Sequence, residues 1–218
     1  MPQSPRNPPI VQPPIRLAVC VSGEGTTLQN LIDQIRARRL RAEIVQVVAS
    51  RPRIGAIPRA EAAGIPLALA NRNARSRTEF SASVFEPIRH SQADLVILGG
   101  FLSLLNIPPE YKGRVLNIHP ALVPAFCGEG YYGSKVHRAV LDSGVKVSGC
   151  TVHIVNGVLD GGPILLQTAV PVLNEDTVET LSARILREEH LTYWRAVDLL
   201  LSGQCEIHGR RIVLTQKP

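Results

Sequence analysis

The sequence predicts a three-layer α/β fold built on a mixed sheet of about seven strands. In the first half of the 218-residue chain, short apolar runs alternate with helical patterns. This alternation is typical of parallel strands joined by right-handed crossovers. In the second half, two strand-like runs lie close enough in sequence to pair as antiparallel neighbours, and one long helical pattern follows them.

The first half starts with a compact apolar run over 16–22, which predicts a buried parallel strand. A glycine-rich turn leads from it into a helix over about 27–38, whose apolar residues recur on one face. The elements that follow are a strand at 42–49, a helix at 57–63, a strand at 66–70, a helix at 78–89 and a strand at 94–98. This half is therefore expected to be Rossmann-like, with a parallel sheet.

The second half continues from a short buried strand that ends near Asn117. The later elements are a helix at 134–143, strands at 147–155 and 164–170, a helix at 177–201 and an edge strand or hairpin within 205–214. We expect one domain over 16–218. The proline-rich segment over 1–15 is expected to be a disordered tail.

Composition narrows the class of function. The formal net charge of +6 and an aromatic content of 4% give weak support for nucleic-acid binding, which favours basic clusters with interleaved aromatics. A small anionic substrate fits this charge better. No apolar stretch approaches a membrane-spanning length, so we expect no membrane partner and a cytoplasmic location. The four cysteines have no zinc-ligand spacing, and no metal is expected.

The motif Asn117-Ile118-His119-Pro120, with Asp160 downstream, points to acyl transfer. Asn117 and His119 are two residues apart, so on a strand they project to the same side, at a carboxyl end where open α/β sheets bind ligands. The amide suits a developing oxyanion, the imidazole suits proton transfer, and the carboxylate can orient the imidazole. Alternatively, Asn117 and His119 only cap a strand end, His119 is a satisfied core histidine, and Asp160 belongs to a turn.

Three glycine-containing segments are candidate binding loops. The turn 22–27 after the first strand offers backbone N–H groups to an anion, or is only a tight turn. The segment 99–105 either lines an apolar slot for a flat ring or packs in the core. The loop 157–163 contains Asp160 and has glycines on both sides of it.

In order along the chain, Ser-Gly-x-Gly-Thr-Thr-Leu-Gln, Gly-Gly-Phe, Asn-Ile-His-Pro-Ala-Leu-Val-Pro, Gly-Cys-Thr-Val-His and Leu-Asp-Gly-Gly-Pro-Ile-Leu-Leu-Gln resemble the phosphoribosylglycinamide formyltransferases. These belong to the wider folate-dependent formyltransferase family. The resemblance covers about 16–203 and implies transfer of a formyl group from 10-formyltetrahydrofolate to glycinamide ribonucleotide in purine synthesis. It implies no metal.

The resemblance also implies roles for individual residues. The catalytic set is Asn117, His119 and Asp160. The ribonucleotide phosphate and ribose would be bound by Gly23, Glu24, Gly25, Thr26, Thr27 and Glu189. The folate would contact Arg77, Leu102, Ser103, Leu104, Leu105, Asn117, Gly157, Val158 and Leu159. A cis peptide bond is expected at Val123-Pro124.

Some features depart from the family pattern or leave alternatives open. Leu186 stands where some relatives have a basic or amide residue near the phosphate, so Arg187 or Lys135 would have to compensate. The run 127–133 is longer than the usual linker. Another folate-dependent formyltransferase, or a formyltetrahydrofolate hydrolase, is the alternative activity, and a non-catalytic nucleotide-binding protein is a further one. We expect a monomer or a homodimer.

Overall fold

The structure, a computed structural model, describes residues 14–72, 75–203 and 205–214. The predicted tail over 1–15 therefore lies almost wholly outside the described residues. The chain divides into two compact units, which we call the N-terminal unit, up to Asn117, and the C-terminal unit, from Ile118 onward. The expectation of a single domain over 16–218 stays a prediction.

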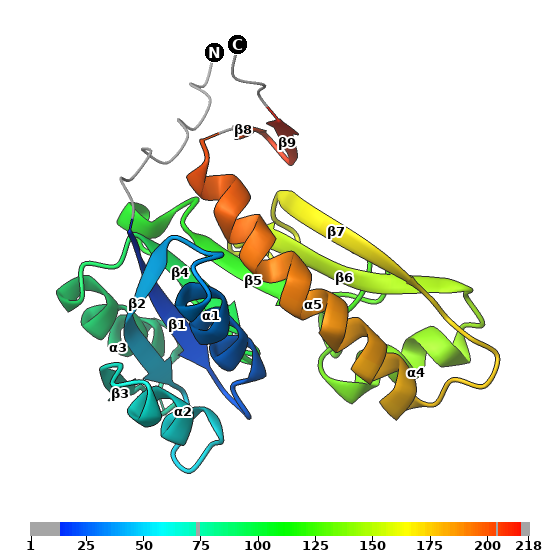
Figure 1. Cartoon of the computed structure of the whole chain (residues 1–218), viewed down its shortest axis with the longest axis horizontal. Helices are drawn as coiled ribbons and strands as arrows, with labels where there is room; N and C mark the ends of the chain where they lie inside the picture. Colours follow the sequence, from blue (N-terminus) through cyan, green and yellow to red (C-terminus); the bar gives the residue numbers. More distant parts are fainter. Residues whose placement is uncertain (1–13, 73–74, 204, 215–218) are drawn as a thin grey trace. The chain divides into compact units, whose positions relative to one another are not determined.

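The main sheet is mixed and has seven strands in the order β3-β2-β1-β4-β5-β6-β7. The pairs β1–β2, β1–β4, β2–β3 and β4–β5 are parallel, and β6–β7 is antiparallel. The predicted parallel half and antiparallel strand pair are thus confirmed (Figure 1).

The N-terminal unit alternates strands with helices (Figure 1). Its elements are β1 (Ile15–Val21), α1 (Thr26–Arg36), β2 (Ala42–Ala49), α2 (Ala56–Ala62), β3 (Leu67–Leu69), α3 (Arg77–His90), β4 (Leu95–Gly99) and the 3-10 helix η1 (Pro109–Tyr111). Strand β5 (Val115–His119) runs across the boundary between the units. β1 is buried from Leu17 to Val21, and this burial explains why it appears in the sequence as a continuous apolar run.

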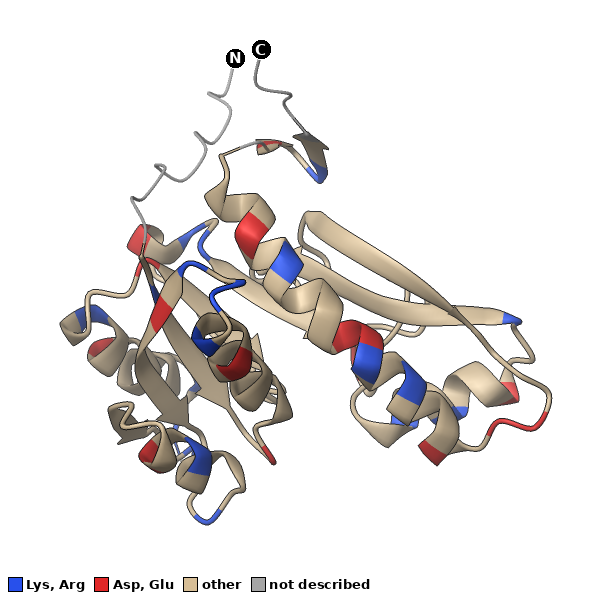
Figure 2. Ribbon diagram, in the orientation of Figure 1, with Lys and Arg blue, Asp and Glu red and all other residues tan. Residues whose placement is uncertain are grey.

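The C-terminal unit consists of α4 (Ser134–Asp142), β6 (Val147–Ile154), β7 (Ile164–Pro171), α5 (Val178–Leu201), β8 (Cys205–His208) and β9 (Arg211–Leu214). Neither β6 nor β7 contains Lys, Arg, Asp or Glu, whereas α5 carries both signs of charge (Figure 2). Leu181 and Ile185 of α5 pack with Val140, Cys150 and Val170 in one core cluster. Burial of this apolar face holds α5 against its own unit.

The element boundaries agree with the sequence to within a few residues. The hairpin alternative for 205–214 is confirmed, because β8 and β9 pair as an antiparallel two-stranded sheet. The cis bond at Val123-Pro124 is confirmed. The cap residue of α1 is Gly25, and Thr26 and Thr27 are already helical.

None of the helices in the described part of the chain is both long and apolar enough to cross a membrane.

Candidate functional site

The strand order places two candidate loops together at a topological switch point. The chain leaves β1 toward β2 and β3, and later returns on the other side of β1 to form β4. Ligands of open α/β sheets bind at the carboxyl ends of strands at such a point. The N–H of Leu102, after β4, donates to Ser22 Oγ, after β1, at 3.1 Å. Ser22 Oγ also bonds Ser50 Oγ at 2.7 Å, so this hydroxyl serves the scaffold.

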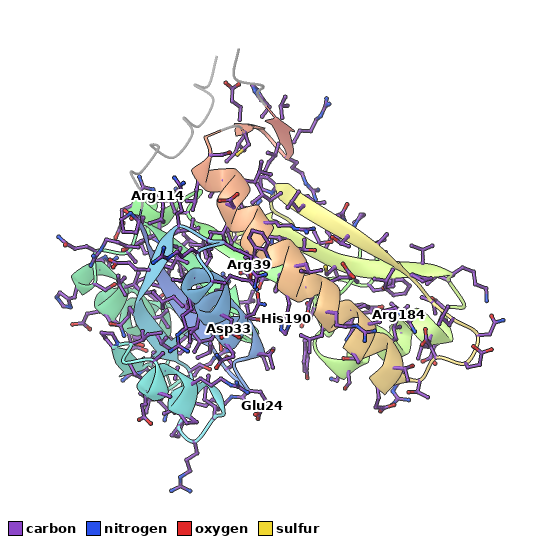
Figure 3. All side chains as sticks on the ribbon, in the orientation of Figure 1. Glu24, Asp33, Arg39, Arg114, Arg184 and His190 are labelled. Atoms are coloured by element: carbon purple, nitrogen blue, oxygen red, sulfur yellow. The ribbon has the colours of Figure 1, made fainter. Side chains whose placement is uncertain are left out.

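The turn between β1 and α1 is shaped by close contact with α2. Gly25 has φ 73° and ψ 29°, and a β-carbon there would lie 2.7 Å from Ala56. Both facts require glycine, whatever the turn binds. Glu24 is labelled in Figure 3, in the turn after β1. Its carboxylate lies against Gly55, the residue before α2, where a β-carbon would collide with it. The acidic side chain of the turn is therefore accommodated at α2.

The segment after β4 presents apolar side chains to solvent. Leu102 and Leu104 are 51% and 43% exposed, whereas Phe101 and Leu105 are buried. The core-packing alternative thus holds for only part of the segment. Arg77 Nη2 donates to the carbonyl of Leu105 at 3.0 Å. The structure therefore places Arg77 beside Leu105, the last residue of this segment.

Strand β5 positions the first two residues of the predicted catalytic set. Ile118 packs against the core cluster of the C-terminal unit. The neighbouring positions Asn117 and His119 share the opposite side of the strand by its two-residue repeat. His119 is buried, and its Nε2 lies 2.8 Å from the carbonyl oxygen of Phe126. Because a carbonyl only accepts, Nε2 carries a proton in this arrangement.

The carboxylate of Asp160 is buried and surrounded by donors. Gly128 N–H donates to Oδ2 at 3.0 Å, and His119 Nδ1 lies 3.6 Å from the same oxygen. Burial by itself raises the pKa of Asp160. Hydrogen bonds from His153 and from Gly128 N–H, together with the charges of His119 and His153, outweigh burial and lower the pKa below its ordinary value. Asp160 is therefore ionised at neutral pH, and the structure places it beside His119, with which it was expected to pair.

His153 is a second imidazole on this carboxylate, and the motif analysis did not identify it as a site residue. Its Nε2 lies 3.5 Å from Asp160 Oδ1. The signal in the sequence was the pair Thr151 and His153, two polar residues of β6 that lie on the same face of the strand. On α4, burial and then the charge of His119 lower the pKa of His137, so this buried imidazole stays neutral.

The loop that carries Asp160 closes tightly on itself. Asn156 Oδ1 accepts from Val158 N–H at 3.1 Å, and Gly161 N–H donates to the Val158 carbonyl at 3.1 Å. A β-carbon at Gly162 would collide with the carbonyl oxygen of Ile154. Asp160 itself has φ 50°. The loop glycines thus give a fixed backbone path, and Val158 and Leu159 point outward, 63% and 41% exposed.

The predicted ribose-binding residue lies on α5. Glu189 is half-buried, and burial raises the pKa of its carboxyl to about 7. Leu186, one helical turn earlier, is half-buried too. Of the two cations expected to compensate for it, Lys135 donates to the hydroxyl of Tyr132 at 3.0 Å and lies over its ring. Arg187 is exposed on α5.

Two of the cysteines are buried thiols in the strands of the main sheet. Burial raises the pKa of Cys20 to about 12 and that of Cys150 to about 11, as expected of structural thiols. Among residues 14–72, 75–203 and 205–214, no group of three or more His, Cys, Asp or Glu side chains is arranged to hold a metal ion.

Known proteins resemble this chain along most of its length. The bovine (Bos taurus) trifunctional purine biosynthetic protein adenosine-3 is 42% identical over 217 residues, which are 97% of this chain and 21% of that protein. The chain thus spans about a fifth of the bovine relative. The chloroplastic phosphoribosylglycinamide formyltransferase of Vigna unguiculata is 38% identical over 190 residues, 85% of this chain and 60% of that protein.

Two solved structures show the same fold. The glycinamide ribonucleotide transformylase 1 of Symbiobacterium toebii has a TM-score of 0.85 and 41% identity, covering 93% of this chain and 94% of that chain. A formyltetrahydrofolate deformylase of Pseudomonas syringae has a TM-score of 0.82 and 26% identity, covering 93% and 66%. The model of the formyl transferase family matches residues 15–197. The chain therefore belongs to the formyl transferase family.

Proposed function

We propose that this chain transfers a formyl group from 10-formyltetrahydrofolate to the amine of glycinamide ribonucleotide, a step of purine synthesis. The observation that carries the proposal is that His119 and the ionised Asp160 are buried beside each other. Asn117 precedes His119 by two residues on the same strand. The identity of the acceptor is supported by the 41% identity to the Symbiobacterium transformylase, against 26% to the deformylase.

The amine nitrogen attacks the formyl carbon, and the carbonyl oxygen becomes an oxyanion in the tetrahedral intermediate. The amide of Asn117 and an N–H of His119 stabilise this oxyanion, because donors positioned before the reaction need no reorganisation as charge develops. Holding both substrates in one geometry supplies further acceleration.

The described arrangement of His119 suggests how its donor is supplied. Its Nε2–H is directed at the Phe126 carbonyl, and Nδ1 faces Asp160. The formyl oxygen takes the place of the Phe126 carbonyl as the acceptor of this N–H. Catalytic hydrogen bonds commonly form only in the substrate complex.

Asp160 orients His119 and accepts the amine proton through a water molecule. Collapse of the intermediate breaks the bond between the formyl carbon and N10 of the folate, and N10 takes up one proton. The amine loses one proton and N10 gains one, so the transfer is balanced without a covalent enzyme intermediate.

Each substrate has a proposed binding segment. The turn with Gly23, Glu24, Gly25, Thr26 and Thr27 would bind the phosphate through backbone N–H groups at the start of α1. Glu189 would accept the ribose hydroxyls. In the N-terminal unit, the exposed leucines after β4, Ser103 and Arg77 are proposed folate contacts. In the C-terminal unit, the 157–159 loop is proposed as a folate contact.

A single assay separates the proposed activity from its rivals. Release of tetrahydrofolate from 10-formyltetrahydrofolate would be followed with glycinamide ribonucleotide, with water alone and with methionyl-tRNA as acceptors. We expect turnover to require glycinamide ribonucleotide. Turnover that proceeds equally with water alone would establish a hydrolase instead.

The cytoplasmic location, the absence of nucleic-acid and membrane partners and the monomeric or homodimeric state stay predictions. Gel filtration with light scattering measures the last of these directly.

The first prediction concerns His119. Replacing it by alanine removes an oxyanion donor, so His119→Ala should lower kcat by about 100-fold or more. Steady-state kinetics measures this, with circular dichroism to verify folding. His90→Ala, which changes an exposed histidine at the end of α3, is the control and should keep full turnover. A folded His119→Ala enzyme with normal kcat would refute the catalytic assignment.

The second prediction concerns Asp160→Asn, which keeps the shape and removes the charge. Turnover should fall by about 100-fold while both KM values stay within a few-fold. The pKa of Asp160 is lowered, so its stabilising contribution is present above the ordinary Asp pKa and is lost as the pH falls through the lowered value. The stability difference between the two proteins should therefore shrink below about pH 4. Normal turnover in Asp160→Asn would remove this residue from the mechanism.

The third prediction concerns the phosphate turn. A β-carbon at Gly23 meets no atom within 4 Å, so Gly23→Ala should fold and place a methyl group in the open space beside the turn. The KM for glycinamide ribonucleotide should rise by about tenfold and the KM for folate should not change. Gly25→Ala should instead lower the melting temperature, because its φ is +73° and Ala56 is too close. Equal losses for both substrates in Gly23→Ala would place the phosphate elsewhere.

The fourth prediction concerns Glu189. Its pKa of about 7 means that the carboxylate, the better acceptor for ribose hydroxyls, forms as the pH rises through neutrality. Calorimetry should show tighter ribonucleotide binding at about pH 8 than at about pH 6, by several-fold. The phosphate of the ribonucleotide also titrates in this range, and its effect is common to all variants. The control Glu188→Gln should therefore keep the full pH dependence, and Glu189→Gln should weaken it. Identical pH profiles for the two variants would show that Glu189 does not bind the ribose.

A further inference from the structure

We propose that Arg59 is a positioning residue that keeps the turn after β1 in its anion-binding form. The inference rests on the proposed function only in taking this turn as the phosphate site. Arg59 lies on α2 and was not among the site residues predicted from sequence. Its Nε donates to the carbonyl of Glu24 at 2.8 Å, and its Nη1 donates to Gln29 Oε1 at 3.3 Å.

Three successive carbonyls of the turn are held by donors. The Gly23 carbonyl accepts from Ala56 N–H at 3.1 Å, the Glu24 carbonyl from Arg59 Nε at 2.8 Å, and the Gly25 carbonyl from Gln29 N–H at 2.9 Å. The first two donors come from α2, and the third, Gln29 N–H, belongs to the first turn of α1. The middle one is the only side chain among the three.

The direction of these carbonyls sets the direction of the amides. In a trans peptide the C=O of one residue and the N–H of the next point in opposite directions. With the Gly23 carbonyl toward Ala56 and the Glu24 carbonyl toward Arg59, the N–H groups of Glu24 and Gly25 point to the other side. Successive N–H groups that end in a left-handed residue form an anion-binding concavity.

Arg59 therefore acts through the backbone, on the carbonyl side of the turn. Without it, the Glu24–Gly25 peptide is held at that point by no side chain and can rotate about its flanking bonds. Rotation would turn a carbonyl oxygen into the concavity, where it would repel a phosphate. A guanidinium suits the task because its fork spans Glu24 and Gln29 together, which an ammonium does not.

The test uses inorganic phosphate as the probe and the amide NMR signals of Glu24 and Gly25 as the readout. Four variants would be titrated beside the unaltered chain: Arg59→Ala, Arg59→Lys, Gln29→Ala and Arg51→Ala. Arg51 is an exposed arginine on the loop before α2, so Arg51→Ala removes the same charge from the same region. The melting temperature of each variant reports folding.

We expect phosphate to shift both amides in the unaltered chain and in Arg51→Ala with equal affinity. Affinity should fall by about tenfold in Arg59→Ala, and by less in Arg59→Lys and Gln29→Ala. An unchanged affinity in Arg59→Ala, or no amide response in the unaltered chain, would overturn the inference. An equal loss of phosphate affinity in Arg51→Ala would also overturn it, because the effect would then come from long-range charge and not from the contact with Glu24.

Formyl transfer is assayed separately, so the two proposals can fail independently. With glycinamide ribonucleotide, Arg59→Ala should raise the KM for the ribonucleotide and leave kcat and the KM for folate near their original values. A phosphate response of the expected kind without formyl transfer would refute the proposed function and leave the role of Arg59 standing. A fall in kcat with an unchanged KM would refute the positioning role.

Discussion

A buried carboxylate needs hydrogen-bond donors around it, and in the C-terminal unit the candidate site residues surround one such carboxylate, that of Asp160. Asp160 receives the N–H of Gly128 and faces the imidazoles of His119 and His153, so its pKa is lowered in spite of burial. These donors come from separate parts of the chain: the end of β5, the 124–133 segment, and β6. The carboxylate thus connects three segments. Removing its charge would leave the buried imidazoles and the Gly128 N–H without their ionised partner.

In the N-terminal unit, the two loops proposed to bind substrates follow the carboxyl ends of the neighbouring strands β1 and β4. The reversal of strand order at β1 and β4 opens the carboxyl ends of these strands, and the bond from Leu102 N–H to Ser22 Oγ joins the two loops there. On one side the turn is held by α2, through Ala56 and Arg59. The segment after β4 carries two exposed apolar side chains two residues apart, Leu102 and Leu104, which are available to the proposed folate ring.

Glycine has distinct duties in the two units. At Gly25 it allows a left-handed backbone and the close approach of Ala56. At Gly149 a β-carbon would collide with the carbonyl oxygen of Thr168 on the paired strand, and at Gly162 with that of Ile154. These positions are therefore constrained by packing, and substitutions there would report on the fold before they report on ligand binding. Gly23, with open space beside it, is the position at which the two effects separate.

The sequence by itself determined the strands and helices, because apolar periodicity depends only on which face of each element is buried. It also predicted Asn117, His119 and Asp160 as the catalytic set, because acyl transfer can use an amide, an imidazole and a carboxylate, and their motifs are local. The tertiary structure alone decided which partners these groups have. His153 faces Asp160, Phe126 accepts from His119, and Arg59 holds the carbonyl of Glu24 across 35 positions of sequence. Such contacts depend on how strands and helices pack, and no local pattern of residues encodes the direction of a peptide group.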